Sequence, residues 1–266
     1  DGGTGNDIYE VDNVGDVVID SSLSTLKSFW MPGNDSVRSS ISYTLGDYVE
    51  NLKLLGTAAL NGTGNSLNNK LVGNSAANSL IGSDGADTLD GGAGVDSMLG
   101  GAGNDTLMGG AGNDLIVSNN GSDTYVFNLG DGQDVINNFD YNEYYLGQPS
   151  MDRLVFGQGI SANDIEFRIE SNNSSNLIVA IKGTNDQVTI QSYFDNTQAY
   201  QLDSIEFVDG TVWDAGQIYN QTNFSPVLVG SQAELFVGFE DTPYTLYAND
   251  LLSGVYDANG DLLTIV

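Results

Sequence analysis

A nine-residue period governs the centre of this 266-residue chain. The frame G-G-x-G-x-D-x-U-x, in which U is apolar, runs without a gap from Gly64 to Val126. Its sixth position carries, in order, Asn69, Asn78, Asp87, Asp96, Asp105, Asp114 and Asp123. Its eighth position carries Leu71, Leu80, Leu89, Met98, Leu107, Ile116 and Tyr125. A further copy opens at Gly2, and a looser one, LGDGQDVIN, follows at Leu129.

A short fixed period predicts a solenoid, because each unit can bury its apolar residue only by stacking on its neighbours. The Gly-rich six-residue part is expected to form a tight loop, since glycine tolerates positive φ. The x-U-x part is expected to form a short strand with U facing inward. With two copies per turn, residues eighteen apart stack. Asn69, Asp87, Asp105 and Asp123 then share one edge, and Asn78, Asp96 and Asp114 share the other.

The stacked carboxylates require a counter-charge. Two of them about 5 Å apart repel by roughly 3 kcal/mol at an effective dielectric constant near 20. No Lys or Arg lies between Lys70 and Arg153, so a cation from solution must neutralise them. Oxygen is the only ligand type available, because the chain has no His and no Cys. Calcium is therefore expected, with magnesium second because it gives up its water reluctantly.

Two other interpretations of the loops explain less. Gly, Asn and Asp are common turn formers in any β-protein, which explains one loop but not an Asp at one position of a strict frame. Gly-rich loops also cradle phosphates, but those loops need a Lys and the start of a helix. The local negative charge here would repel an anion.

The nonapeptide resembles the RTX (repeats-in-toxin) calcium-binding β-roll. The resemblance implies that each ion lies between loops of adjacent turns. The earlier loop gives its second and fourth carbonyls and its Asp, and the later loop gives its first and third carbonyls and its Asp. The first implied site comprises Ser83, Gly85, Asp87, Gly100, Ala102 and Asp105. The second comprises Gly92, Gly94, Asp96, Gly109, Ala111 and Asp114. The third comprises Gly101, Gly103, Asp105, Ser118, Asn120 and Asp123.

Some positions depart from the RTX pattern. Asn69 and Asn78 replace Asp, which removes charge and predicts turns with few ions or none. Asp7 follows a well-formed loop, but its partner turn is expected to precede this chain. Asp134, Asp140 and Asp152 are candidates for one more ion, with ordinary turn roles as the alternative.

Composition limits the partners. The net charge of −29 argues against nucleic acid, whose phosphates need clustered Lys and Arg. No apolar run is long enough to span a membrane. The absence of Cys excludes disulfides and fits an exported bacterial protein. The fold class we expect is all-β.

We expect four parts along the chain. Residues 1–63 form an irregular solenoid, and residues 64–138 form the calcium-binding β-roll. Residues 139–222 read as strands separated by turns, and they resemble the domain that closes RTX rolls at the C-terminal end. Such a cap would cover Tyr125, Phe127 and Ile136. Residues 223–266 resemble the start of a cadherin-like tandem domain, an Ig-type sandwich. The chain is expected to be a fragment.

Several other residues are candidates with an ordinary alternative. Tyr141, Tyr144 and Tyr145 could stack on a sugar, but packing is the expected role. Phe29 and Trp30 are expected to form a local packing plug. Interdomain calcium ligands are expected at Glu240, Asp241, Asp257, Asn259 and Asp261. An EF-hand is not expected there, because Leu262 stands where that loop needs glycine.

Two functions fit these features. The first is a non-catalytic, calcium-dependent structural module of a large secreted or surface protein, an adhesin. The resemblance implies export through type I secretion machinery, with folding outside the cell. The second is the secretion and folding appendage of an exoenzyme such as a protease, lipase or alginate epimerase. Ice binding would need Thr at the third loop position, where the roll has Asp84, Ala93, Ala102 and Ala111. Catalysis by this segment is not expected, since it has no His or Cys.

Overall fold

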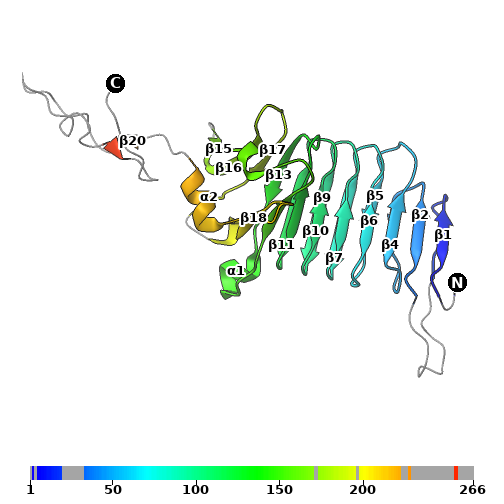
Figure 1. Ribbon diagram of the computed structural model, residues 1–266. Coiled ribbons are helices and arrows are strands. Elements are labelled where there is room, and N and C mark those ends of the chain that lie inside the picture. The colour runs from blue at the N-terminus through cyan, green and yellow to red at the C-terminus, as the bar shows by residue number, and fades with distance from the viewer. Residues whose placement is uncertain are drawn as a thin grey trace, which may run out of the picture. The chain divides into compact units, whose positions relative to one another are not determined.

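A computed structural model describes residues 2, 5–19, 33–170, 173–195, 198–222, 227–228 and 255–256. Contacts divide the chain into two compact units, Asp1–Ile218 and Tyr219–Val266. The first unit contains two long sheets that lie face to face (Figure 1). In the second unit, the short strands β20 (Val227–Leu228) and β21 (Val255–Tyr256) pair antiparallel.

From β2 to β14 the two sheets take alternate strands of the chain, as a roll with two strands per turn requires. The ten-stranded sheet contains, in spatial order, β1 (Ile8–Val11), β2 (Ser36–Ser39), β4 (Asn51–Leu54), β6 (Lys70–Val72), β8 (Thr88–Asp90), β10 (Thr106–Met108), β12 (Thr124–Phe127), β14 (Arg153–Phe156), β18 (Ser204–Glu206) and β19 (Val212–Asp214). The nine-stranded sheet contains β15 (Ile165–Glu170), β16 (Asn173–Ile181), β17 (Gln187–Ile190), β13 (Gln133–Asn137), β11 (Leu115–Asn120), β9 (Ser97–Ala102), β7 (Ser79–Asp84), β5 (Asn61–Thr63) and β3 (Tyr43–Thr44).

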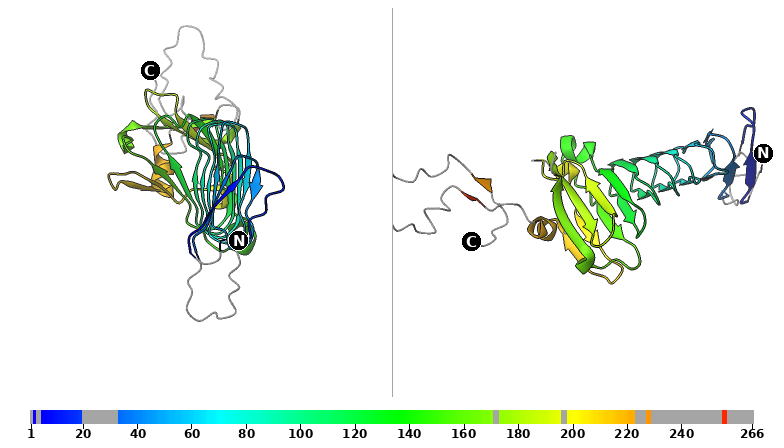
Figure 2. Two further views of the ribbon diagram at one scale, coloured as in Figure 1. Left: turned by 90° about the vertical axis from the view of Figure 1, so that its right-hand side faces the viewer. Right: turned by 90° about the horizontal axis from the view of Figure 1, so that it is seen from above.

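Pairing within the nonapeptide array is parallel, with a shift of eighteen residues per turn. Thr88 pairs with Thr106, which pairs with Thr124. On the other sheet, Leu80 pairs with Met98. This register confirms the all-β fold and the turn of two nonapeptides. Figure 2 shows the roll as a thin two-layered stack that widens where β13 to β19 lie.

The interior of the roll consists of two facing rows of apolar side chains, one from each sheet. Every eighth-position residue from Leu71 to Tyr125 is at most 2% exposed. The flanking residues of each triad point outward and are partly exposed, as in β8 and β10. One apolar residue per nonapeptide therefore forms the core, and the alternation of the strand places it there.

The strands after residue 138 extend both sheets. β14 pairs parallel with β12, and β17 pairs parallel with β13. The pairing then becomes antiparallel between β16 and β17, β15 and β16, and β18 and β19. Phe156 packs edge-on against Phe127, with ring centroids 6.1 Å apart, and stacks on Phe207 at 5.4 Å. The division of the chain into four parts stays a prediction.

The described ranges also contain two α-helices and two 3-10 helices. They are α1 (Tyr141–Leu146), α2 (Ala215–Gln221), η1 (Ala162–Asp164) and η2 (Gln198–Tyr200). None of the helices in the described ranges is long and apolar enough to cross a membrane. The expected packing plug at Phe29 and Trp30 lies outside the described residues. So do the expected calcium ligands from Glu240 to Asp261.

Candidate calcium sites

Each edge of the roll carries a ladder of aspartates joined by hydrogen bonds. The backbone N–H of each Asp donates to the Oδ1 atom of the Asp one turn later. Asp87 donates to Asp105 at 2.8 Å, and Asp105 donates to Asp123 at 2.8 Å. On the opposite edge, Asp96 donates to Asp114 at 2.7 Å. The two edges predicted from the eighteen-residue repeat are therefore present.

The other carboxylate oxygen of these five aspartates has no hydrogen-bond partner. The Oδ2 atoms that are buried without a hydrogen bond belong to Asp7, Asp87, Asp96, Asp105, Asp114 and Asp123. The last five of these residues are at most 2% exposed. A buried, unpaired charged oxygen is costly, and a bound cation removes that cost. The chemistry of these donors therefore fits a hard divalent ion such as calcium.

Loop glycines bring main-chain oxygens to the same points. A Cβ atom at Gly91 would lie 2.6 Å from both Asp96 Oδ2 and the Gly109 carbonyl oxygen. These two oxygens therefore flank one point, and both belong to the second expected site. The Cβ position of Gly82 likewise meets Asp87 Oδ2 and the Gly100 carbonyl, which belong to the first expected site.

The loops at residues 82–87, 91–96 and 100–105, which we call the calcium loops, share a backbone with positive φ at the second and fourth positions. Gly92 and Gly94 have φ of 94° and 124°, and Gly101 and Gly103 have 122° and 133°. Gly85 has 115°, while Ser83 adopts 91° without being glycine. This conformation favours glycine, which explains the Gly-rich frame.

The third-position carbonyls already accept hydrogen bonds from the preceding turn. These bonds are 2.8 Å long and run to Ala102 from Gly85, to Ala111 from Gly94 and to Asn120 from Gly103. A carbonyl oxygen has a second lone pair that remains available for an ion. Ser118, the last first-position residue, is buried, and its Oγ accepts a hydrogen bond from the Tyr125 hydroxyl at 2.6 Å. Ligation by the individual residues of the three sites stays a prediction.

Burial raises the pKa values of the ladder carboxylates. The pKa of Asp87 and of Asp96 rises to about 6, and that of Asp105 and of Asp123 rises to about 7. Desolvation is the main cause, with a smaller contribution from neighbouring carboxylates and an opposing one from the backbone hydrogen bonds. Near neutral pH the folded loops therefore favour either a proton or a cation at these oxygens.

The edge that carries Asp87, Asp105 and Asp123 has the same kind of hydrogen bond on both sides of the nonapeptide array. At the N-terminal end, the Asp7 N–H donates to Asp35 Oδ1 at 2.7 Å, and the Asp35 N–H donates to Glu50 Oε2 at 2.8 Å. At the other end, the Asp123 N–H donates to Asp152, and the Asp152 N–H donates to Asp203. Sequence reasoning expected the partner of Asp7 before the chain and missed Asp35. The shared letters G-N-D in both loops were a usable signal.

The three aspartates considered for one further ion do not come together. Asp134 belongs to the Asp96 ladder, where its Oδ1 accepts the Asp114 N–H at 3.0 Å. Asp152 belongs to the opposite ladder. Asp140 caps α1 by accepting the N–H groups of residues 142 and 143. Its position therefore has an ordinary helix-capping role.

Asp134 instead approaches Asp114. A Cβ atom at Gly109 would lie 2.5 Å from Asp114 Oδ2 and 3.0 Å from Asp134 Oδ2. Asp134 therefore continues the Asp96 ladder by one turn, despite the two-residue insertion before it. Among the described residues, no three His, Cys, Asp or Glu side chains gather as a metal site. The expected sites would each need only two carboxylates, completed by carbonyls.

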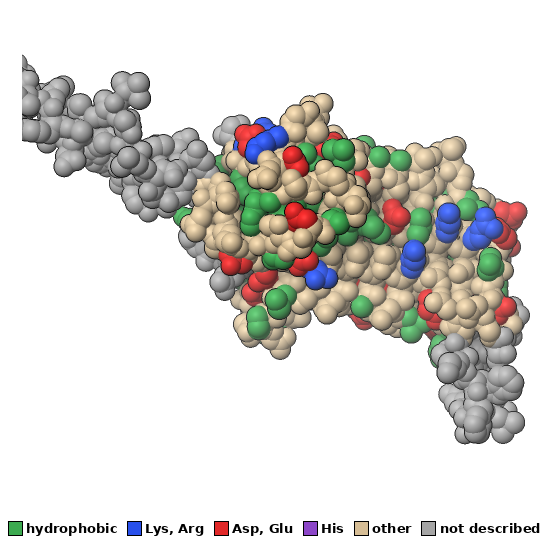
Figure 3. Space-filling model, viewed as in Figure 1, with side chains coloured by type: hydrophobic (Ala, Val, Ile, Leu, Met, Phe, Trp, Pro, Cys, Tyr) green, Lys and Arg blue, Asp and Glu red, His purple; other side chains and the backbone are tan. Residues whose placement is uncertain are grey.

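The tyrosines of α1 pack mainly against one another. Tyr141, Tyr144 and Tyr145 are 52%, 46% and 61% exposed, and α1 has no buried residue. The ring centroids of Tyr141 and Tyr145 are 4.5 Å apart, and those of Tyr144 and Tyr145 are 4.6 Å apart. Hydrophobic side chains protrude where α1 lies in Figure 3.

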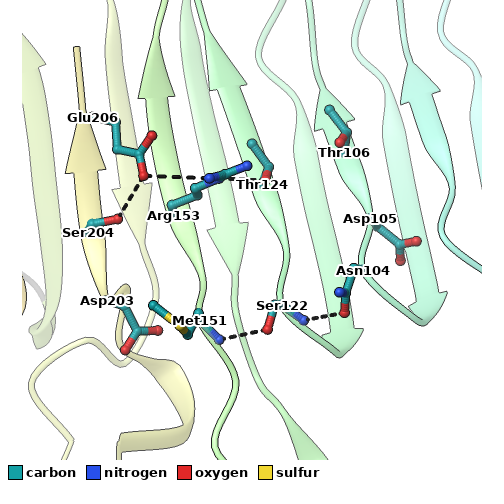
Figure 4. A pocket seen from close by; sticks show the side chains of 10 residues that line it. All are labelled: Asn104, Asp105, Thr106, Ser122, Thr124, Met151, Arg153, Asp203, Ser204 and Glu206. Carbon is teal, nitrogen blue, oxygen red and sulfur yellow. Dashed lines mark hydrogen bonds and ion pairs between the residues drawn. The ribbon is translucent and has the colours of Figure 1, made fainter. Parts of the chain in front are cut away.

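A shallow polar groove of about 400 Å³ lies on the outer face beside the Asp105 ladder (Figure 4). Arg153 crosses it, with its Nε atom donating to Thr124 Oγ1 at 3.0 Å. Along its lower side in that view, the Ser122 N–H donates to Asn104 Oδ1 and the Met151 N–H donates to Ser122 Oγ. These bonds connect successive turns, so the residues that line the groove help to hold the turns together.

Comparison with known proteins agrees with this geometry. Residues 63–98, 91–125 and 99–136 match the RTX calcium-binding nonapeptide repeat. Residues 176–217 match the haemolysin-type calcium binding protein related domain. A stretch of 89 residues is 36% identical to the iron-regulated protein FrpA of Neisseria meningitidis serogroup C, and it covers 33% of this chain but 7% of FrpA. The chain thus carries RTX calcium-binding nonapeptide repeats, followed by a domain related to haemolysin-type calcium-binding proteins.

Proposed function

We propose that this chain is a non-catalytic structural module of a secreted or cell-surface protein, and that calcium drives its folding. The supporting observation is the row of buried, unpaired Oδ2 atoms in five consecutive half-turns from Asp87 to Asp123. No Lys or Arg lies between Lys70 and Arg153, which leaves that charge to a cation from solution. Each site held at about ten times its Kd adds roughly 1.4 kcal/mol to the stability of the folded state.

Circular dichroism of the whole chain tests this function. In excess chelator the acidic turns should lose their β signal, and millimolar calcium should restore it. Potassium at the same ionic strength is the control, because it screens charge equally but, with one charge and a larger radius, is attracted much less strongly to a pair of carboxylates. A spectrum that does not change on chelation would refute the proposal.

The strands from β14 to β19 act in this proposal as a cap that covers the last turn. The supporting observations are the pairing of β14 and β17 with the final roll strands and the burial of Tyr125, Phe127 and Ile136. An uncovered end would expose those side chains and the strand edges to water.

We further propose an adhesin as the parent protein, exported unfolded through a type I secretion channel. Two features support this: the resemblance of Ser225 onward to a cadherin-like domain, and the charge of the acidic turns, which opposes folding while calcium is scarce. An appendage of an exoenzyme is the alternative. Sequence on both sides of this segment would decide, since further tandem domains fit an adhesin and a catalytic domain fits an exoenzyme.

A further inference from the structure

Two loops of the roll use amide groups where the later loops have unpaired carboxylate oxygens. We call residues 64–69 and 73–78 the amide loops. In the second of them, Asn78 Oδ1 accepts the Asn74 N–H at 2.7 Å, and its Nδ2 donates to the Leu60 carbonyl at 2.9 Å. In the first, Asn69 Nδ2 donates to the Glu50 carbonyl at 3.2 Å. Both side chains are at most 4% exposed, and neither has an unpaired buried atom.

Asparagine at the second position of each amide loop adds further links to the preceding turn. Asn65 Nδ2 donates to the Gly46 and Val49 carbonyls at 2.8 Å each. Asn74 Nδ2 donates to the Ala58 carbonyl at 2.8 Å. Each amide loop is therefore joined to the preceding turn through two side chains, without an ion.

The backbone of the amide loops also differs from that of the calcium loops. No residue in 64–69 or 73–78 has positive φ, whereas the loops at 82–87, 91–96 and 100–105 each have two such residues. Leu67 and Ala76 occupy the fourth position of the amide loops, where the later loops have glycine. The conformation shared by the calcium loops is thus absent here.

Charge changes at the same boundary. Residues 45–81 contain four charged side chains, Asp47, Glu50, Lys53 and Lys70, and carry no net charge. Residues 82–125 contain seven aspartates and no Lys or Arg. Self-repulsion therefore opposes folding only in the second segment.

We infer that the turns from Leu45 to Ile81 keep their stacked fold without calcium, and that they form a ready-made edge on which the acidic turns assemble when calcium binds. The second half of this inference rests on the proposed function. The preformed edge already supplies the strands β6 and β7, with which the first acidic strands β8 and β9 pair. Calcium-driven folding then extends an existing sheet and avoids the cost of closing a first turn.

Hydrogen exchange measured by mass spectrometry on the whole chain tests the inference. In calcium-free buffer at pH 7.5, amides of β4, β5 and β6 should stay protected while those of β8 to β12 exchange. With calcium, both segments should be protected. Loss of protection in both segments without calcium would overturn this inference and leave the proposed function intact. Full protection of both segments without calcium would overturn the proposed function and this inference together.

One pair of variants tests the role of the amides. Asn78→Asp replaces the Nδ2 donor with a carboxylate oxygen, which faces the Leu60 carbonyl. Calcium-free protection of β5 and β6 should fall about tenfold, as expected when a buried carbonyl loses its partner. Asn68→Asp is the matched control, because that exposed side chain only accepts the Ala86 N–H, which a carboxylate also does. Equal protection in the two variants would contradict the inference, since it would assign the effect to charge alone.

Discussion

The Asp105→Asn substitution changes one atom of a carboxylate in the middle of its ladder. Asparagine keeps Oδ1, which accepts the Asp87 N–H, so the hydrogen bond of 2.8 Å can persist. It replaces the buried, unpaired Oδ2 with an amide that cannot bind a cation. The variant therefore separates the hydrogen bond of the ladder from its ion binding, which an alanine would remove together.

With calcium at about ten times the Kd, Asp105→Asn should lower the free energy of unfolding by roughly 3 kcal/mol. This loss of free energy is the sum over two expected sites that share Asp105, each contributing about 1.4 kcal/mol. Asp87→Asn and Asp123→Asn should each cost about half as much, because each of those residues belongs to one of the three sites. Without calcium the sign should reverse, since the pKa of Asp105, raised to about 7, shows that burial disfavours its charge.

Urea denaturation followed by circular dichroism, with calcium and with chelator, measures both effects. Asp90→Asn is the control, because it removes one charge from strand β8 without removing a ladder oxygen. In calcium, equal losses of unfolding free energy for the substitutions at residues 87, 105 and 123 would refute the assigned sharing of ions. A loss of stability in chelator for Asp105→Asn would refute the electrostatic reasoning.

Three further predictions concern protons, backbone strain and the cap. The raised pKa values of the buried carboxylates stabilise the calcium-free fold at low pH, and this contribution is lost as pH rises through about 6 to 7. Denaturation in calcium-depleted buffer should therefore give a higher unfolding free energy at pH 5 than at pH 8, with a smaller difference when calcium is present. Ser83→Gly relieves a positive φ and should stabilise the calcium-bound fold by about 1 kcal/mol, whereas Gly91→Ala should raise the calcium midpoint, both checked by titration. A chain ending at Asn138 should need far more calcium to fold than one ending at Asn220, and equal midpoints would show that the later strands fold independently.

The nonapeptide frame predicted the roll because every repeat places its loop and its inward-facing apolar residue at the same positions. The eighth position predicted the buried rows, and the eighteen-residue spacing predicted the pairing of Thr88 with Thr106. The partner of Asp123 could not be predicted in the same way. Helix α1 lies between Asp123 and Asp152, and no period spans that distance. Long-range pairing of this kind depends on loop geometry that local sequence does not encode.

The sequence predicted which residue types form the candidate sites, but it did not predict how far the aspartate ladders extend along the chain. Carboxylates without counter-charge indicated a cation, and the unpaired Oδ2 atoms agree with that reasoning. The extension through Asp35 was missed because a long insertion separates its loop from that of Asp7. For Asn78 the sequence predicted only the loss of a charge. It did not show that the Asn78 amide donates a hydrogen bond to the Leu60 carbonyl.

The ladder hydrogen bonds have a direction that bears on how the chain leaves a ribosome or a narrow channel. In every pair the donor belongs to the earlier turn and the acceptor to the later one, as in Asp87 to Asp105 and Asp105 to Asp123. A chain that emerges with its N-terminus first therefore always presents a last turn whose backbone donor has no acceptor yet. That donor gains its acceptor after eighteen more residues within the array, but only after 29 more at Asp123 and 51 more at Asp152. The series ends at Asp203, whose carboxylate accepts the Asp152 N–H. Emergence of that residue is the event that completes the ladder.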